Sequence, residues 1–344
     1  MRKNLSLVCM LVFIGVSCSP STPIVTPTVQ PTLAPTAIVE NPPPCPEAEL
    51  VFHTKLQQML LVNCVEDASK ENPNVIWGWN GTGWQRVTEG GPLRRILGGV
   101  SYDEKRNVLV LYGGRPIALG KCNQETWEWD GESWTQKEVT PPTACDHVKM
   151  VYDVASGESV LFSGLDPAEK LVNETWSWNG AEWKQLSKEG PESRGHFGFV
   201  YDPSHEQILL YGGYARTVTD EFWVWKDGKW KEINFSGPGN LSHFGMTYDT
   251  DANALYIFGG ATSTSTFSSL TNKTWVLQDG KWKELNPVSA PSKRGGPAMA
   301  YEPVRKRIVL YGGFDASPLS IARLAHDVNL PLSLIADLVY RDLG

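Results

Sequence analysis

Arginine and histidine recur at two fixed positions along this chain of 344 residues. Relative to a repeated tyrosine, the arginines stand seven residues before it and the histidines five residues before it, at Arg95, Arg194, Arg294, His147, His196 and His243. Guanidinium groups bind carboxylates through paired hydrogen bonds, so converging side chains of these types could hold an anionic ligand or a carbohydrate carboxylate. At one position of a repeat, such donors more often hold neighbouring loops in register, and we favour this structural role.

The elements that must position these side chains belong to a repeat of about 50 residues. All 14 tryptophans fall in five clusters, whose first members are Trp77, Trp127, Trp176, Trp223 and Trp275. Each repeat also has a tyrosine or phenylalanine, followed 11 residues later by a glycine pair or its remnant. A fixed period of this length indicates a repeat architecture.

Each repeat contains four short segments typical of strands. Apolar runs such as residues 108–112 lead into the glycines, and Asx-Gly pairs such as Asp130-Gly131 separate the last two segments. Asx-Gly readily takes the positive φ of a tight hairpin. Four antiparallel strands per repeat predict the blade of a β-propeller in an all-β fold. The W-x-W motif places both rings on one sheet face, so we expect tryptophan to pack between blades rather than to bind ligand.

The pattern Tyr-Asp, Leu-Tyr-Gly-Gly and Thr-Trp-x-Trp-(Asp/Asn)-Gly-x-x-Trp resembles the Kelch repeat, in the variety common in bacterial envelope proteins. The resemblance covers residues 47–313 and implies a propeller whose blades pack around a central channel. Five blades are complete, although the first has His53 and Asn63-Cys64 in place of the acid and the glycine pair. The sixth has its two inner strands, and no tryptophan follows Gly313.

Residues 314–344 depart from the repeat and form an atypical C-terminal tail. Apolar residues at helical spacing, over 321–328 and 335–339, predict helix on either side of Pro331. Two interpretations stay open: the tail covers the exposed edge of the sixth blade, or it is an aberrant end without a specific role.

The N-terminal segments indicate export and anchoring. An apolar stretch after Arg2 and Lys3 is too short for a permanent membrane span and is typical of a signal peptide, here residues 1–18. Residues 15–18 resemble a bacterial lipobox, which implies a lipid anchor on Cys18. Gly15 departs from the usual aliphatic residue, so an ordinary cleaved signal is the alternative. The proline-rich segment 19–46 is typical of an extended tether. We therefore expect an exported protein, lipid-anchored on the outer face of a membrane of the bacterial cell envelope.

Four cysteines remain after the two in the N-terminal segment, at Cys45, Cys64, Cys122 and Cys145. An even number in an oxidising compartment favours pairing. The repeat register puts Cys45 and Cys64 on one rim of the first blade, and Cys122 and Cys145 on the same face of the next two blades. We therefore predict the disulfide bonds Cys45–Cys64 and Cys122–Cys145. Unpaired buried thiols are the alternative, and metal ligation is disfavoured because no Cys-x-x-Cys occurs.

Length variation points to one rim as the binding surface. The interval from the glycine position to the first tryptophan varies from 11 to 16 residues, whereas that from the last tryptophan to the next tyrosine stays at 18 or 19. The variable loop and the connections between blades share a rim, and variable faces of repeat proteins commonly carry the binding residues. We predict a monomeric binding module without a cofactor or metal that recognises a protein or a glycan there.

Other functions stay open at this stage. Kelch-type propellers include galactose oxidases and sugar-acid epimerases, so the resemblance makes a carbohydrate-active enzyme with its site at the channel mouth the second hypothesis. No acid–base pair or copper-ligand set can be assigned from spacing. A purely structural envelope component is the third hypothesis. The net charge of −7 and the absence of a basic stripe argue against nucleic-acid binding.

Overall fold

The computed structural model describes residues 41–64, 73–116, 119, 121–234 and 236–317, which all belong to one unit, Val39–Gly344. The expected anchor at Cys18, most of the expected tether and most of the expected helical tail lie outside these residues. Among the described residues, no helical segment has the length and apolar character that crossing a bilayer requires.

Five sheets of four antiparallel strands form five complete blades. Blade 1 consists of β1 (Glu49–His53), β2 (Gln58–Val62), β3 (Pro73–Trp79) and β4 (Trp84–Leu93). Blade 2 consists of β6 (Gly99–Asp103), β7 (Val108–Tyr112), β9 (Thr126–Trp129) and β10 (Trp134–Lys137). Blade 3 consists of β11 (Lys149–Asp153), β12 (Glu158–Phe162), β13 (Thr175–Trp178) and β14 (Trp183–Ser187).

The remaining blades follow the same order. Blade 4 consists of β15 (Gly198–Asp202), β16 (Gln207–Tyr211), β17 (Phe222–Lys226) and β18 (Lys229–Glu232). Blade 5 consists of β19 (Gly245–Asp249), β20 (Ala254–Phe258), β21 (Thr274–Gln278) and β22 (Lys281–Leu285). Blade 6 has only β23 (Ala298–Glu302) and β24 (Arg307–Tyr311) among the described residues. A small separate sheet pairs β5 (Arg95–Ile96) with β8 (Arg115–Pro116).

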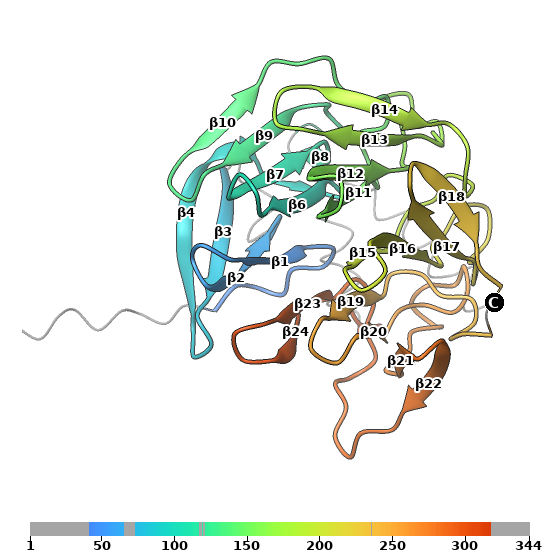
Figure 1. Cartoon of the computed structure of the whole chain (residues 1–344). Coiled ribbons are helices and arrows are strands. Elements are labelled where there is room, and N and C mark those ends of the chain that lie inside the picture. The colour runs from blue at the N-terminus through green and yellow to red at the C-terminus, as the bar shows by residue number, and fades with distance from the viewer. Residues whose placement is uncertain (1–40, 65–72, 117–118, 120, 235, 318–344) are drawn as a thin grey trace, which may run out of the picture. The chain divides into compact units, whose positions relative to one another are not determined.

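The first strand of each blade is the innermost, and these strands contact one another in sequence around the centre (Figure 1). The ring is continuous, because β23 of blade 6 lies against both β19 of blade 5 and β1 of blade 1. The predicted all-β propeller, with five complete blades and an incomplete sixth, is thereby confirmed within the described part of the chain.

The first glycine of the repeated pair lies where the next blade comes closest. At four such glycines φ lies between 61 and 71°, and a Cβ would stand within 2.9 Å of a carbonyl oxygen of the following blade: Gly113, Gly212, Gly259 and Gly312. At these four positions glycine avoids both the backbone strain and the contact, whereas Asn63 and Ser163 hold the same positive φ at the equivalent positions of blades 1 and 3. Gly312 meets the oxygen of Cys45 in blade 1 in this way. The last and first blades are therefore joined with the same geometry as three of the other junctions.

Tryptophan packs between the blades, as the W-x-W motif indicates. Trp129 and Trp178 are fully buried. The Nε1 of Trp183 in blade 3 donates to Thr126 Oγ1 of blade 2 at 2.8 Å. A buried indole whose N–H is satisfied across a sheet contributes both apolar area and register. The tryptophan rows are thus part of the scaffold.

The Tyr-Asp acids cap the turns between the first two strands. Asp103 Oδ1 accepts the N–H of Arg106 at 2.9 Å, and Asp249 Oδ1 accepts the N–H of Asp251 at 3.0 Å. Carboxylates commonly bond the backbone two or three residues on in such turns. These turns lie on the rim opposite the variable loops.

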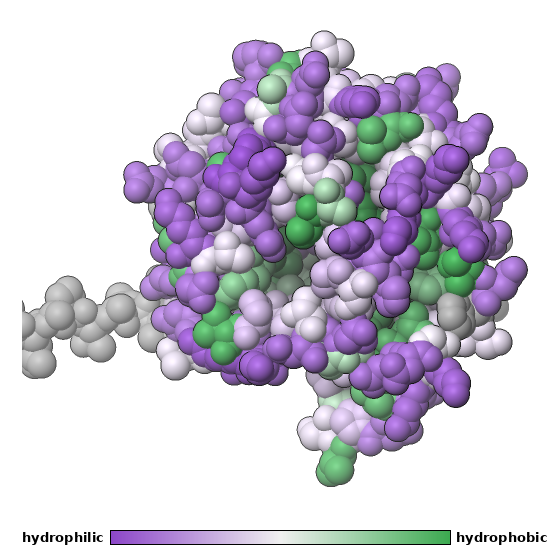
Figure 2. Space-filling model, in the orientation of Figure 1, coloured by the Kyte–Doolittle hydropathy of each residue, from purple (hydrophilic) through white to green (hydrophobic). Residues whose placement is uncertain are grey.

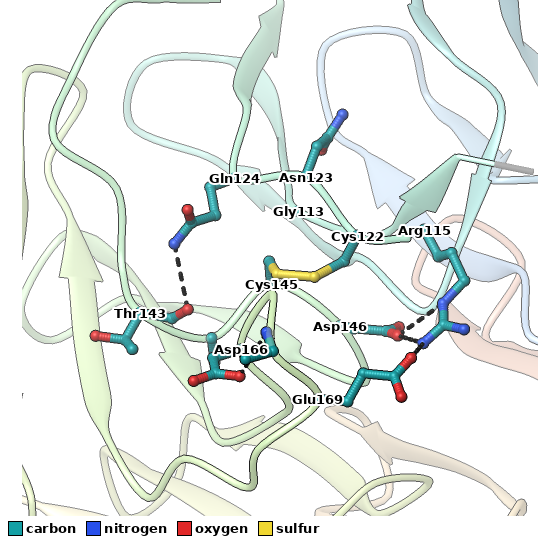
Figure 3. The surroundings of a disulfide bond; sticks show 12 residues. Gly113, Arg115, Cys122, Asn123, Gln124, Thr143, Cys145, Asp146, Asp166 and Glu169 are labelled. Carbon is teal, nitrogen blue, oxygen red and sulfur yellow. Dashed lines mark hydrogen bonds and ion pairs between the residues drawn. A yellow bond between two sulfur atoms is a disulfide. The ribbon is translucent and has the colours of Figure 1, made fainter. Parts of the chain in front are cut away.

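Both predicted disulfide bonds, Cys45–Cys64 and Cys122–Cys145, are present. The first joins the segment before β1 to the end of β2. The second joins the loop before β9 to the segment before β11 (Figure 3). Beside it, Arg115 pairs with Asp146 at 2.5 Å. The sequence separations are 19 and 23 residues, and closing loops of that length typically stabilises a fold by about 3 kcal/mol each.

The alanine substitution at Gly312 tests the junction. We expect Gly312→Ala to lower the free energy of unfolding more than Gly131→Ala. Both positions have positive φ, so both substitutions cost roughly 1 kcal/mol of backbone strain. Only Gly312 also faces a carbonyl oxygen, whereas nothing lies within 4 Å of a Cβ at Gly131. Urea unfolding measures the two losses, and equal losses would contradict the close-contact explanation.

A buried carboxylate between blades 2 and 3 makes stability depend on pH. Glu128 accepts the indole N–H of Trp178 at 2.8 Å and contacts Lys137 at 2.9 Å and Arg106 at 2.5 Å. Burial alone would raise the pKa of Glu128, but these three donors outweigh burial and lower it below its usual range. Because the folded-state pKa is the lower one, the stabilisation is present at neutral pH and disappears as the pH falls through the acid range.

We therefore expect Glu128→Gln to lower the free energy of unfolding by about 1–3 kcal/mol at pH 7, since it removes the charged acceptor of these hydrogen bonds. The difference from wild type should shrink at a pH below the usual carboxyl pKa of about 4.3. Urea unfolding at pH 7 and in the acid range checks this, with the exposed Glu132→Gln as the matched control. A cost independent of pH would contradict the role of the charge.

Candidate functional site

Six equivalent turns surround the centre of one rim of the ring. The residue two positions before each innermost strand has a positive φ, between 53 and 61°. These residues are Glu47, Leu97, His147, His196, His243 and Gly296. All three histidines of the predicted site belong to this set, in three consecutive blades.

Backbone hydrogen bonds connect four of these turns across blade junctions. His243 N–H donates to the oxygen of His196 at 3.0 Å, and Gly296 N–H donates to that of His243 at 2.7 Å. Glu47 N–H then donates to the oxygen of Gly296 at 3.0 Å, across the junction between the last and first blades. Side chains at these positions therefore have fixed starting points relative to one another.

The side chains on these turns form a polar cluster of Glu47, His147, His196 and His243, called here the channel-mouth cluster. The rings of His196 and His243 stack with centroids 3.6 Å apart, and His147 lies edge-on to His196 at 4.8 Å. Glu47 Oε2 lies 3.5 Å from His196 Nδ1. Gly296 leaves the room that Glu47 needs, because a Cβ there would stand 2.6 Å from Glu47 Oε1.

Electrostatics set the charge of the channel-mouth cluster. Burial alone would raise the pKa of Glu47, but His196, His243 and Lys149 outweigh it and hold that pKa well below its usual range. Burial lowers the pKa of His196 despite the attraction of Glu47. Burial, with the neighbouring His196, lowers that of His243 well below its usual value. At neutral pH an ionised carboxylate therefore faces two neutral imidazoles.

A second pair of charges lies beside the cluster. Lys149 forms an ion pair with Glu49. Burial alone would lower the pKa of Lys149, but the charges of Glu49 and Glu47 outweigh burial and raise it. The ammonium group therefore stays charged, and its positive charge is largely balanced by Glu49.

The space at the channel mouth is small. Glu47, Lys149, His196 and His243 line a cavity of about 60 Å³, which continues between the inner strands of blades 4, 5 and 6. Figure 2 shows one face of the molecule, hollowed near the centre of the ring. A water molecule needs about 10–15 Å³ of such volume, so the cavity holds a few. Sites for drug-sized ligands are typically about 300–1,000 Å³.

The three predicted arginines do not join the channel-mouth cluster. The guanidinium groups of Arg95, Arg194 and Arg294 turn back into their own blades. Each donates through Nη1 to the oxygen of the first glycine of the pair, at 2.8, 3.2 and 2.9 Å respectively. Arg95 and Arg194 are fully buried and also pair with a glutamate, at 2.8 and 2.6 Å. These are the register-holding contacts that the structural interpretation expects.

The variable loops form a rim around the channel mouth. The first residue after the glycine pair bridges back to the residue just before each inner turn, in the pairs Asp146–Leu165, Gly195–Tyr214, Ser242–Ala261 and Gly295–Phe314. Three loops also expose large apolar side chains, with exposed fractions of 53, 52 and 40% for Leu119, Leu171 and Tyr214. We call this surface the variable rim.

Sequence reasoning missed Glu47, although the signal for it was available. Glu47 stands five residues before Phe52, the same offset at which the histidines precede their tyrosines. The first repeat has His53 and Asn63-Cys64 in place of the acid and the glycine pair, which obscures this match of register. Lys149 and Glu49 share a second register position, three residues before the aromatic residue.

The fold and the site define a β-propeller with a polar cluster at its channel mouth and loops of variable length around it. No family model matches the chain, and a search of the curated proteins finds no match. The solved structure titled "Structure of YjhT" is similar, with a TM-score of 0.63 over 81% of this chain and 93% of that chain. The two sequences are 12% identical, so the similarity shows the propeller fold alone.

Proposed function

We propose that the chain is an exported, membrane-anchored binding module that recognises a protein or a glycan through the variable rim. The observation that carries this proposal is the size of the cavity at the channel mouth. About 60 Å³ accommodates an ion and water but not a sugar ring. A larger ligand must therefore be bound by the loops around the opening.

The chemistry of the variable rim supports recognition of a macromolecule or a glycan. Tyr214 offers an exposed aromatic ring with a hydroxyl group, and Leu119 and Leu171 add exposed apolar area on neighbouring loops. Exposed tyrosine is enriched among the residues that dominate binding interfaces, and its ring also stacks on sugars. Arg115, on the loop that carries Leu119, is held by Asp146, which ties that loop to the blade 3 turn.

Two kinds of observation, the disulfide bonds and the N-terminal sequence, support export and anchoring. Two disulfide bonds are typical of proteins that fold in an oxidising compartment. The lipobox-like residues 15–18 and the proline-rich segment after them supply an anchor at Cys18 and a spacer. The repeat pattern supports assignment to the Kelch-type propellers of bacterial envelope lipoproteins.

A carbohydrate-active enzyme is the second candidate, and one observation favours it. The ionised carboxylate of Glu47 lies 3.5 Å from the imidazole of His196, and such a pair could move a proton on a sugar acid placed over the channel mouth. A galactose oxidase-like site has less support. Its Tyr–Cys cross-link requires a free cysteine, and the four cysteines in the described ranges are all in disulfide bonds.

Binding through the variable rim is tested with a glycan array and with photo-crosslinking, using residues 19–344. We expect Tyr214→Ala and Leu171→Ser each to weaken binding about tenfold or more, since anchor side chains that become buried in a complex contribute more than 1 kcal/mol to its binding free energy. Val154→Ser is the matched control, because Val154 is equally exposed on the opposite rim. A crosslinker at position 171 should capture a protein ligand that one at position 154 does not.

Two outcomes would contradict the binding proposal. Equal loss in the Val154→Ser control would show that the variable rim is not the binding surface. Mass spectrometry of sugars recovered after incubation would reveal chemical change, and turnover abolished by Glu47→Gln would favour the enzyme instead.

The anchor is tested by growth of a bacterial host with an alkyne-labelled fatty acid. We expect the wild-type protein to incorporate the label and to enter the detergent phase on partitioning. Cys18→Ser should abolish both, because the thiol that carries the lipid is gone, whereas Cys9→Ser within the signal segment should change neither. Labelling that persists in the Cys18→Ser protein would exclude Cys18 as the anchor.

A further inference from the structure

We propose that Glu47, His196 and His243 bind one divalent transition-metal ion of the zinc class at the channel mouth, with a coordination position left open. One carboxylate oxygen and one ring nitrogen from each histidine lie within 4.8 Å of one another. This inference is independent of how the variable rim binds its ligand.

The donor atoms lack other partners. Glu47 Oε1 and His196 Nδ1 are buried and have no hydrogen-bond partner among the described residues. Glu47 Oε2 and His196 Nδ1 are 3.5 Å apart, which is long for a hydrogen bond. Buried polar atoms without partners lose the hydrogen bonds that they make with water in the unfolded chain, which destabilises the fold. A cation between them would satisfy both.

The third ligand is already oriented. His243 Nδ1 lies 3.0 Å from the hydroxyl oxygen of Ser242. This contact engages Nδ1 and not Nε2, and metal-binding histidines commonly have their second ring nitrogen held by such a partner. The backbone hydrogen bonds from His196 through Gly296 to Glu47 fix the three turns relative to one another.

The donor set selects the class of metal. Two imidazoles and one carboxylate suit zinc, copper, nickel or iron, whereas calcium and magnesium prefer oxygen ligands alone. Three protein ligands leave a fourth position of a tetrahedral site open, as in sites that bind or activate a ligand.

Metal binding requires the stacked rings of His196 and His243 to turn apart, because the in-plane lone pairs of parallel imidazoles do not converge on one ion. Ligand atoms around tetrahedral zinc are roughly 3.3 Å apart, given bonds of about 2.0 Å, so the present spread has to contract by side-chain rotation. The cavity of about 60 Å³ provides the volume for an ion and one water. Lys149 also faces the site, and its pairing with Glu49 offsets its repulsion of a cation.

Calorimetry with ZnCl₂ and absorption with CoCl₂, both on protein without a histidine tag, test the site. We expect one equivalent of Zn²⁺ to bind and Co²⁺ to give the visible bands of low-symmetry four-coordinate cobalt. Glu47→Gln and His243→Ala should each weaken Zn²⁺ binding by about ten- to a hundredfold or more. The matched control is His205→Ala, because His205 is exposed on the opposite rim and would report only adventitious surface binding.

X-ray absorption at the zinc edge of the wild-type protein keeps the test independent of how the variants fold. We expect two imidazole nitrogens and one or two oxygens at about 2.0–2.1 Å. The proposal is overturned if the wild type binds no stoichiometric zinc. It is equally overturned if correctly folded Glu47→Gln and His243→Ala proteins bind as tightly as the wild type, or if His205→Ala removes the binding.

Discussion

The residue after each second strand has a positive φ, and at four of the six positions it is a glycine in close contact with a carbonyl oxygen of the next blade. This close contact is the constraint on which the rest of the structure depends. It sets how near one blade comes to the next, and the tryptophans fill the space that this distance leaves. The arginine of the inter-blade connection bonds that same glycine, so the connection and the contact are held together. The six turns at the channel mouth follow directly, because each continues into an innermost strand.

Much of this arrangement was accessible from the sequence because it is local and periodic. The register of Tyr102 and Gly113, repeated along the chain, predicts strand order, turn positions and both disulfide pairs without knowledge of the ring. It also predicts that Arg95 and its equivalents act as scaffold, since a donor at one repeat position meets the same acceptor in each blade. The burial of Trp178 against the preceding blade has the same origin.

The channel-mouth cluster was only half predictable, because it depends on ring closure. Glu47 and His196 are separated by 149 residues, and they meet only because blade 6 brings the last inner turn beside the first. The repeat period does not show that a side chain at position 296 would block this approach. Nor does it show that His196 and His243 stack rather than diverge. Nor does spacing alone show how small the opening becomes once six turns are packed around it.

If the chain is tethered at its N-terminus, the disulfide bond between Cys45 and Cys64 affects how a pulling force enters the propeller. No strand is shared between the first and last blades in the described structure, so β1 is held beside β23 by side-by-side packing and by a few hydrogen bonds. A force applied through the tether reaches Cys45 before it reaches β1. The covalent bond passes that load to the end of β2, in the interior of blade 1. The strand at the seam is therefore shielded from peeling, because the load bypasses it.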